Sequence, residues 1–297
     1  MYQLFTDTSA NLPTAYCRAH NIHVIPLYYY IDGEEHTCLD TAAFEDTAYY
    51  TAMKKGKAVT TSQITPGNFI QAFRPVLERG EDIIYVCMAR RISGSYDSAA
   101  SARDELLAEF PERRIALINT RGAGFGEGIP VMVCADARDA GADFDAAVAA
   151  GERCVRYIYQ VFTVDDLMYL GRTGRCSNFS AWVGSALNIK PLLKAADEGV
   201  IVTFAKIRGR KKAIKALAQY YDDNVVRADE QTVCISYAGC PDDAQTLAAM
   251  IRENHPPKEL WVVPHEPVTG SHLGPGALAL FFISKHNRDT GEDDGLY

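Results

Sequence analysis

The first half of the chain alternates short apolar runs with helical patterns, and this alternation strongly limits the possible folds. Strands are predicted at residues 2–5, 23–31, 83–88 and 115–118. Helices are predicted between and after them, at residues 41–54, 67–78, 95–110 and 126–140. Strands separated by helices of this length form βαβ units with a largely parallel sheet. Such sheets bind ligands at the carboxyl ends of their strands, where the loops 7–13, 89–96 and 119–126 should gather.

The second half has a different pattern, which predicts a mixed α/β domain. After a helix at 146–157, strands are expected at 159–163, 189–194, 200–206, 233–237 and 260–263, and an apolar run occupies 277–283. Helices are expected at 181–187, 211–221 and 242–253. A turn at 196–199 joins two of the strands into an antiparallel hairpin. We therefore expect an α/β protein with an N-terminal domain at 1–160 and a C-terminal domain at 161–297, ending in a frayed tail from residue 287.

Composition excludes several classes of function. The net charge of −8 over 297 residues argues against non-specific nucleic-acid binding. The eight cysteines are scattered without a C-x-x-C pair, which favours reduced cysteines and gives no zinc spacing. The N-terminus lacks the pattern of a signal peptide, and no apolar run approaches the roughly 20 residues of a membrane span. We expect a cytosolic protein without a metal, a cofactor or stable membrane insertion.

Two hydroxyl-rich segments precede predicted helices. Thr61 and Ser62 lie shortly before Thr65 and Pro66, which read as a helix N-cap and first helical residue. That assignment leaves the two earlier hydroxyls unexplained, so on the pattern alone a ligand role for them and a purely structural role remain equally open. Hydroxyls beside a helix N-terminus can bind a carboxylate or a phosphate.

The second hydroxyl-rich segment, Ser93-Gly94-Ser95, follows a predicted strand and begins a helix. The Gly-x-Ser-x-Gly pattern of a hydrolase elbow is missing, so a capping or anion-binding serine is favoured over a nucleophile. The alternating glycines at 122–128 do not have dinucleotide-binding spacing, and the chain contains no Gly-x-x-x-x-Gly-Lys-Ser/Thr loop. These glycines more simply allow a helix to pack tightly on the sheet.

Basic residues and one histidine give further possibilities in the second half. Arg175 follows a glycine-punctuated loop, and His272 precedes a Gly-Pro-Gly turn, where it could donate to an anionic group. A basic run is most simply a solvated helix start, although in an acidic chain it could also steer an acidic partner. The residues of that run expected at a docking surface are Arg208, Arg210, Lys211 and Lys212.

Taken in order, these segments resemble the DegV family of bacterial fatty-acid-binding proteins. The resemblance covers almost the whole chain and rests on the ordered set, because each motif alone is weak. The matching stretches are Thr6-Asp7-Thr8-Ser9 with Leu12-Pro13, Val24-Ile25-Pro26-Leu27, Thr61-Ser62-Gln63, Ser93-Gly94-Ser95-Tyr96, Leu170 with Gly174-Arg175, Leu187-Asn188-Ile189-Lys190-Pro191, the basic run 206–212, and His272 with Gly274-Pro275-Gly276-Ala277.

The resemblance implies a two-domain α/β protein that buries one long-chain fatty acid between its domains. It implies that Thr61 and Ser93 bind the carboxylate with His272 nearby, and we include Ser62, Gly94 and Arg175 among the expected ligand-binding residues. In some members the protein presents the acid to a separate ATP-dependent fatty acid kinase. The chain departs from the family pattern at Ile64-Thr65-Pro66 and at Thr173-Gly174-Arg175.

The physics of an acyl chain agrees with this expectation. Burial gains about 0.8 kcal/mol per CH₂, so an apolar tunnel supplies affinity while a few hydroxyls fix the head group. We therefore expect a lipid-binding carrier with no catalytic residues. Two alternatives stay open: an acyl- or phosphoryl-transfer enzyme using Ser93 and His272, and a regulatory module without a small ligand.

Overall fold

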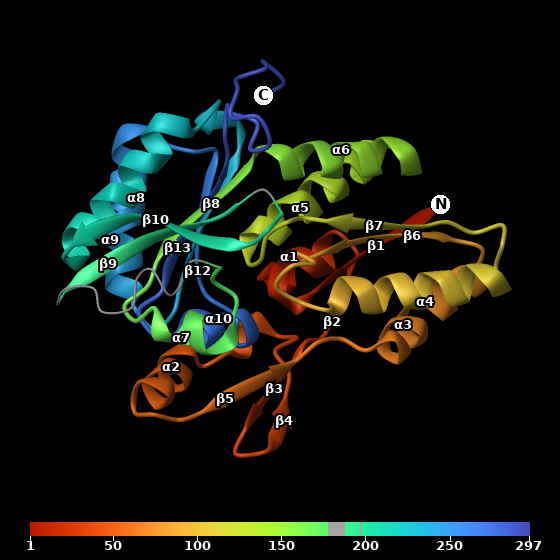
Figure 1. Ribbon diagram of the computed structural model, residues 1–297. Helices are drawn as coiled ribbons and strands as arrows, with labels where there is room; N and C mark the ends of the chain where they lie inside the picture. The colour runs from red at the N-terminus through yellow and green to blue at the C-terminus, as the bar shows by residue number, and fades with distance from the viewer. Residues whose placement is uncertain (178–187, 197) are drawn as a thin grey trace. The chain divides into compact units, whose positions relative to one another are not determined.

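The computed structural model describes residues 1–177, 188–196 and 198–297 and divides them into two compact α/β units (Figure 1). Unit 1 comprises Met1–Phe44 and Thr60–Val155, and unit 2 comprises Glu45–Val59 and Arg156–Tyr297. The predicted α/β class with two domains is confirmed. The segment Glu45–Val59 belongs with unit 2, which a single boundary near residue 160 does not describe.

Unit 1 contains a four-stranded sheet in the order β2-β1-β6-β7, with every neighbouring pair parallel as predicted. One of its two central strands, β6, is buried along its whole length, as expected for a parallel sheet covered on both faces. Figure 1 shows α3 and α4 side by side on one side of this sheet and α5 on the other. The elements are β1 (Tyr2–Asp7), α1 (Thr14–Ala19), β2 (Ile22–Ile25), α3 (Pro66–Glu78), β6 (Asp82–Cys87), α4 (Ser95–Glu109), β7 (Ile115–Asn119), α5 (Phe125–Asp139) and α6 (Phe144–Tyr157), which ends in unit 2.

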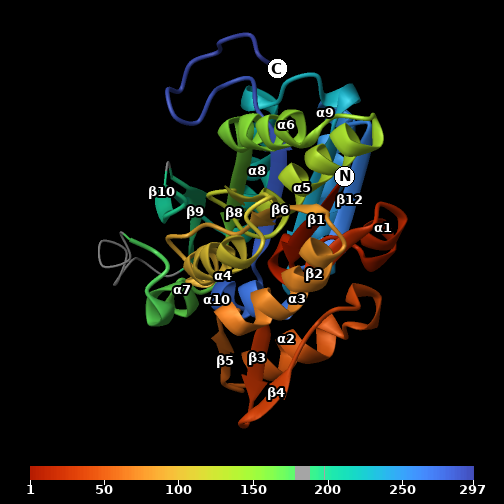
Figure 2. The same ribbon diagram turned by 90° about the vertical axis from the view of Figure 1, so that its right-hand side faces the viewer.

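A small second sheet departs from the predicted elements. The strand expected at 23–31 is two strands, because Pro26 cannot donate a ladder hydrogen bond and the chain leaves the parallel sheet there. Its second part, β3 (Tyr28–Ile31), turns through Asp32 and Gly33, both at positive φ, into β4 (Glu34–His36). Together with the unpredicted β5 (Val59–Ser62) they form a sheet in the order β4-β3-β5 (Figure 2).

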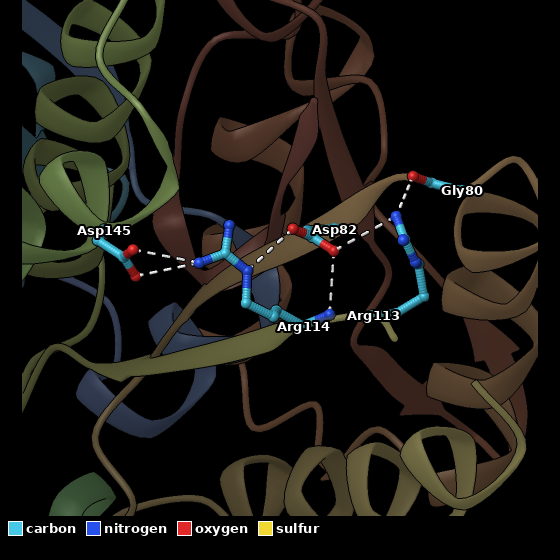
Figure 3. A network of polar contacts seen from close by, with 5 residues as sticks. All are labelled: Gly80, Asp82, Arg113, Arg114 and Asp145. Carbon is cyan, nitrogen blue, oxygen red and sulfur yellow. Dashed lines mark hydrogen bonds and ion pairs between the residues drawn. The ribbon is translucent and has the colours of Figure 1, made fainter. Parts of the chain in front are cut away.

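An ion-pair network joins strands at the amino end of the parallel sheet (Figure 3). The Asp82 carboxylate accepts hydrogen bonds from the Arg114 backbone N–H and from Arg114 Nε, each at 3.0 Å. Arg114 Nη1 lies 3.2 Å from Asp145 Oδ2, and Arg113 donates to the Gly80 carbonyl. The network therefore ties β6 and β7 to the start of α6, at the sheet edge opposite to the loops expected to bind a ligand.

Unit 2 is built on a six-stranded mixed sheet in the order β10-β9-β8-β13-β11-β12. The predicted hairpin is confirmed, since β9 and β10 pair antiparallel. Figure 1 shows α8 and α9 side by side along this sheet, where their apolar faces join the core. The elements are β8 (Ile158–Thr163), α7 (Met168–Thr173), β9 (Ile189–Ala195), β10 (Ile201–Arg208), α8 (Arg210–Asn224), β11 (Thr232–Tyr237), α9 (Pro241–Asn254), β12 (Glu259–Pro264), α10 (Pro267–Leu273) and β13 (Leu278–Ile283).

The helix expected at 41–54 is a 3₁₀ turn, Thr41–Ala43, followed by α2 (Asp46–Lys54), and α2 packs within unit 2. Tyr50 Oη donates to the His265 carbonyl at 2.7 Å, and Tyr49 Oη donates to the Pro267 carbonyl at 2.8 Å. Both tyrosines are buried, so they hold α2 on the segment that begins α10.

Two expectations for unit 2 have different outcomes. The helix expected at 181–187 lies outside the described residues. The tail expected to be frayed from residue 287 contains no helix or strand, and residues 289–296 are exposed. Its residues still make contacts: Arg288 Nη2 donates to the Ala195 and Ala196 carbonyls, and the Tyr297 ring packs 4.8 Å from the Tyr157 ring. In the described part of the chain, no helix is both long and apolar enough to cross a bilayer.

Candidate functional site

The carboxyl ends of the strands in unit 1 gather their loops, as the sequence predicts. The Ala89 N–H donates to the Gly122 carbonyl at 2.7 Å, and the Thr120 N–H donates to the Cys87 carbonyl at 3.0 Å. A Cβ on Gly128 would lie 2.5 Å from the Ala10 carbonyl oxygen, so this glycine lets α5 approach the loop after β1. The loops expected at this end of the sheet are therefore connected by close contacts within unit 1.

The structure brings the two hydroxyl-rich segments into contact. Thr61 and Ser62 end β5, and the chain that follows them is bonded to the start of α4. The Ile64 N–H donates to Ser95 Oγ at 3.2 Å, and Gln63 Nε2 donates to Ser98 Oγ at 3.1 Å. All the hydroxyl-segment residues predicted from the sequence lie on these joined loops and are half-buried: Thr61, Ser62, Ser93 and Gly94.

Thr65 and Pro66 act as the helix start that the sequence predicts. Thr65 Oγ1 accepts the Asn68 N–H at 3.3 Å, and Asn68 Oδ1 accepts the Thr65 N–H at 3.2 Å, which is a capping box. Helix α3 is therefore capped without Thr61 or Ser62. Ser62 Oγ instead lies 3.4 Å from Tyr30 Oη of β3.

The first turn of α4 lies directly beside Ser93. Ser93 Oγ accepts the Ser95 N–H at 3.2 Å and lies 3.0 Å from Ser95 Oγ. Gly94, at the N-cap, offers no side chain to the helix N-terminus. The N-terminal end of α4, a fifteen-residue helix, carries partial positive charge. The hydroxyls and backbone N–H groups at this end are therefore suited to bind an anion.

Unit 2 brings His272 and Arg175 together. His272 lies on α10, which packs against α7, and Arg175 follows α7. Burial, and secondly the positive charge of Arg175, lower the pKa of His272 to about 4, so the imidazole is neutral at pH 7. Burial also lowers the pKa of Arg175, whose Nη1 donates to the Thr173 carbonyl at 2.7 Å.

Two glycines in the turn after His272 allow that turn to pack closely against residues at and just before the start of α7. Gly274 and Gly276 have φ values of +81° and +85°. A Cβ on either would lie within 2.4 Å of an atom of Tyr169 or Asp165. Both glycines are therefore required by conformation and by space.

The residues of the basic run differ in whether they form ion pairs within unit 2. Arg208, Lys211 and Lys212 are exposed. Arg210 is held inside unit 2: its Nε lies 2.8 Å from Asp243 Oδ2, and its Nη1 lies 3.7 Å from Asp165 Oδ1. Of the four residues predicted for docking, Arg210 has a structural ion-pair role, and the other three present their charges to solvent.

A buried acidic cluster beside the unit 1 loops is missed by the sequence reasoning. Asp7 accepts the Tyr85 hydroxyl at 2.7 Å and the Ser9 N–H at 2.9 Å. Glu127 accepts the Thr6 hydroxyl at 2.7 Å and the Ser9 hydroxyl. Both carboxyl groups are fully buried, and burial raises the pKa of each, for Glu127 assisted by the charge of Asp7. The sequence feature that could have indicated this cluster is a glutamate, Glu127, among the apolar residues at the start of α5.

A second buried pair fixes the loop before α10. Ser236 Oγ lies 2.5 Å from His265 Nδ1, and burial lowers the pKa of His265 to about 4. Glu266 then caps α10 by accepting the Val268 and Thr269 N–H groups. These contacts position the helix that carries His272. Among the described residues, no group of three His, Cys, Asp or Glu side chains is arranged to hold a metal ion.

The chain is similar to known proteins along nearly its whole length. A family model described as "Uncharacterised protein, DegV family" matches residues 1–285. A DegV domain-containing protein of Clostridium perfringens is 36% identical over 282 residues, covering 95% of this chain and 97% of the relative. One of Lactococcus lactis is 32% identical, covering 97% and 99%.

Solved structures give the same result. A fatty acid binding DegV family protein from Thermus thermophilus superimposes with a TM-score of 0.84 at 26% identity, covering 95% of this chain and 99% of that one. A fatty acid binding DegV family protein from Streptococcus agalactiae gives 0.83 at 28% identity, covering 96% and 98%. DegV of Bacillus subtilis, described as a fatty acid binding protein, gives 0.81 at 26%, covering 96% and 99%.

Proposed function

The chain belongs to the DegV family, and from this premise we propose that it binds one long-chain fatty acid in an apolar tunnel. The observation that carries the proposal is the match to three solved fatty acid binding proteins over at least 95% of this chain. The connected hydroxyl loops of unit 1 support it, because they contain the residue types that a carboxylate head group requires.

We assign the carboxylate to Thr61, Ser62, Ser93 and Gly94 at the start of α4. Neutral hydroxyl and N–H donors bind an anion without adding a permanent charge to an apolar site. The partial charge of the α4 N-terminus adds to the attraction. In this proposal the acyl chain supplies most of the affinity and the hydroxyl loops supply the preference for an acid.

In unit 2 we propose that His272 and Arg175 bind an anionic group. The burial and the neighbouring Arg175 charge that lower the pKa of His272 keep the imidazole neutral, so it offers one N–H donor at pH 7. Arg175 carries the positive charge that would favour an anion. These assignments rest on the family resemblance and on the proximity of the two side chains.

We further propose that the protein is a carrier that presents its fatty acid to a separate ATP-dependent kinase. The exposed residues Arg208, Lys211 and Lys212 are suited to dock an acidic surface of such a partner. The protein itself then needs no nucleotide loop and no catalytic residue.

The experiment that tests the head-group assignment compares two serines of the same helix segment. Ser93→Ala should weaken palmitate binding about tenfold, because a hydrogen bond to a charged acceptor is lost. Ser101→Ala is the control, since Ser101 is exposed and its hydroxyl bonds to the Asp97 carbonyl within α4. Calorimetric titration of delipidated protein measures both, and equal affinities for the two variants would remove Ser93 from the site.

A further inference from the structure

Two side-chain hydrogen bonds join the loop after β5 to the first turns of α4. In one, Ser95 Oγ accepts the Ile64 N–H at 3.2 Å, and in the other Ser98 Oγ accepts from Gln63 Nε2 at 3.1 Å. Ser95 is fully buried and Ser98 is 5% exposed. We call these two bonds the loop clasp. The loop clasp joins the segment that follows Thr61 and Ser62 to the helix that follows Ser93.

Gly94 provides the space for one half of the loop clasp. Its φ of −75° and ψ of −1° are open to any residue, so conformation does not require glycine there. A Cβ on Gly94 would instead lie 1.9 Å from Gln63 Oε1. The Gln63 carboxamide therefore fits against the bare backbone of Gly94, with its nitrogen directed to Ser98.

Ser95 is also linked to the proposed ligand residue Ser93. The Ser93 hydroxyl donates to Ser95 Oγ at 3.0 Å, and Ser95 Oγ also accepts the Ile64 N–H. A hydroxyl has one proton to donate. In the structure the Ser93 proton is directed at Ser95, while the Ser95 N–H donates to Ser93 Oγ at 3.2 Å. When the Ser93 proton turns to a carboxylate, the Ser95 N–H still holds Ser93 Oγ in place. Ser95 thus positions Ser93 without touching the ligand.

Resting on the proposed function, we infer that Ser95 and Gln63 are positioning residues for the carboxylate site. They hold the two hydroxyl-rich loops at a fixed separation, and Ser95 fixes the position of the Ser93 side chain. Their effect is limited to the binding of the head group. Ser95 and Gln63 therefore set the preference for a fatty acid over a neutral lipid of equal chain length.

The test compares palmitate with hexadecanol, which has the same chain length and a neutral head. Ser95→Ala and Gln63→Ala should each lower the ratio of palmitate affinity to hexadecanol affinity about tenfold, as expected for a disturbed charge-assisted hydrogen bond. Ser101→Ala and Gln71→Ala are the matched controls, both at exposed positions of unit 1, and should leave the ratio unchanged. Urea unfolding of each variant checks that it is folded.

A second comparison tests whether Gly94 acts through Gln63. Gly94→Ala displaces only the end of a flexible side chain, so the variant should fold and lose the same acid preference as Gln63→Ala. The double variant should be no worse than either single variant, because both remove one contact. Gly67→Ala, where a Cβ meets only Thr65 Oγ1 at 3.8 Å, is the control.

Four results would contradict the inference. An equal loss of palmitate and hexadecanol binding would show that the loop clasp serves the fold alone, and an unchanged ratio would show no role. Additive losses in the double variant would separate Gly94 from Gln63. Wild-type protein that binds neither lipid would refute the proposed function itself and the inference with it.

Discussion

Asp7 and Glu127 place two carboxyl groups in the interior of unit 1, with their oxygens bonded to hydroxyls and an N–H group. Two buried negative charges this close are costly, so the pair retains a proton well above the usual carboxyl range. Burial raises the pKa of both groups, and the charge of Asp7 adds to the effect on Glu127.

These raised pKa values predict how stability depends on pH. The pKa of a carboxyl group in the unfolded chain is about 4. When the folded pKa is higher, the protonated carboxyl stabilises the folded state, and this contribution is complete below the unfolded pKa. That contribution is lost as pH rises through the folded pKa. Glu127→Gln imitates the protonated form, so its free energy of unfolding relative to wild type should increase as the pH rises above about 4 towards the raised folded pKa.

Urea unfolding across this pH range measures the effect. Glu112→Gln is the control, because Glu112 is an exposed carboxyl of the same unit. Its difference from wild type should not vary with pH. If Glu127→Gln and wild type show parallel pH curves, the pair holds no extra proton.

At the residue level, the sequence indicates the hydroxyl loops well because their residue types are unusual before a helix. It does not indicate the Asp7–Glu127 pair, since the two residues are 120 positions apart and meet only through packing of α5 on β1. The role of Gln63 is hidden for the same reason: its partner Ser98 lies 35 positions away.

At the element level, α2 illustrates how buried tyrosines hold a short helix, and Tyr50 is the more deeply buried of its two tyrosines. Tyr50 is 1% exposed, and its ring fits against Gly239 and Gly270, where a Cβ would come within 2.8 Å and 1.9 Å of tyrosine atoms. Its hydroxyl bonds to the His265 carbonyl. Helix α2 thereby becomes part of unit 2.

We expect Tyr50→Ala to destabilise the protein by about 3–5 kcal/mol, because a large buried ring is replaced by a cavity. Tyr50→Phe keeps the ring and should cost only about 1–2 kcal/mol for the lost hydrogen bond. Urea unfolding measures both. The control is Tyr30→Phe, whose hydroxyl bonds to Glu35 at the exposed surface. A Tyr50→Ala variant as stable as that control would contradict the anchoring role.

Element prediction succeeds where a pattern is long and periodic. Helices α3, α4 and α5 begin within a residue of their expected positions, because caps, proline and glycine mark their starts. It fails where Pro26 divides an apolar run and for the seven-residue α10, since a short segment contains too few residues for a periodic signal.

At the level of the whole molecule, the chain passes between its two units more than once. A boundary near residue 160 follows from the change of pattern in the sequence, whereas the assignment of Glu45–Val59 to unit 2 follows from tertiary contacts such as those of Tyr50. No local sequence pattern indicates that Glu45–Val59 belongs to unit 2.

The proposed partner surface belongs to this level too. Reversing two exposed charges with Lys211→Glu and Lys212→Glu should leave palmitate binding unchanged and slow phosphorylation of the bound acid by a fatty acid kinase about tenfold. The matched control is Lys54→Glu with Lys55→Glu, an exposed lysine pair of α2 and the following turn that gives the same change in net charge. Equal rates for both double variants would remove the basic run from docking.

Native mass spectrometry of the purified chain, together with analysis of its lipid extract, measures directly whether the protein holds one fatty acid. We expect one long-chain fatty acid per chain, or uptake of one when palmitate or oleate is added to delipidated protein. A protein that is empty on purification and takes up neither acid would contradict the proposed function.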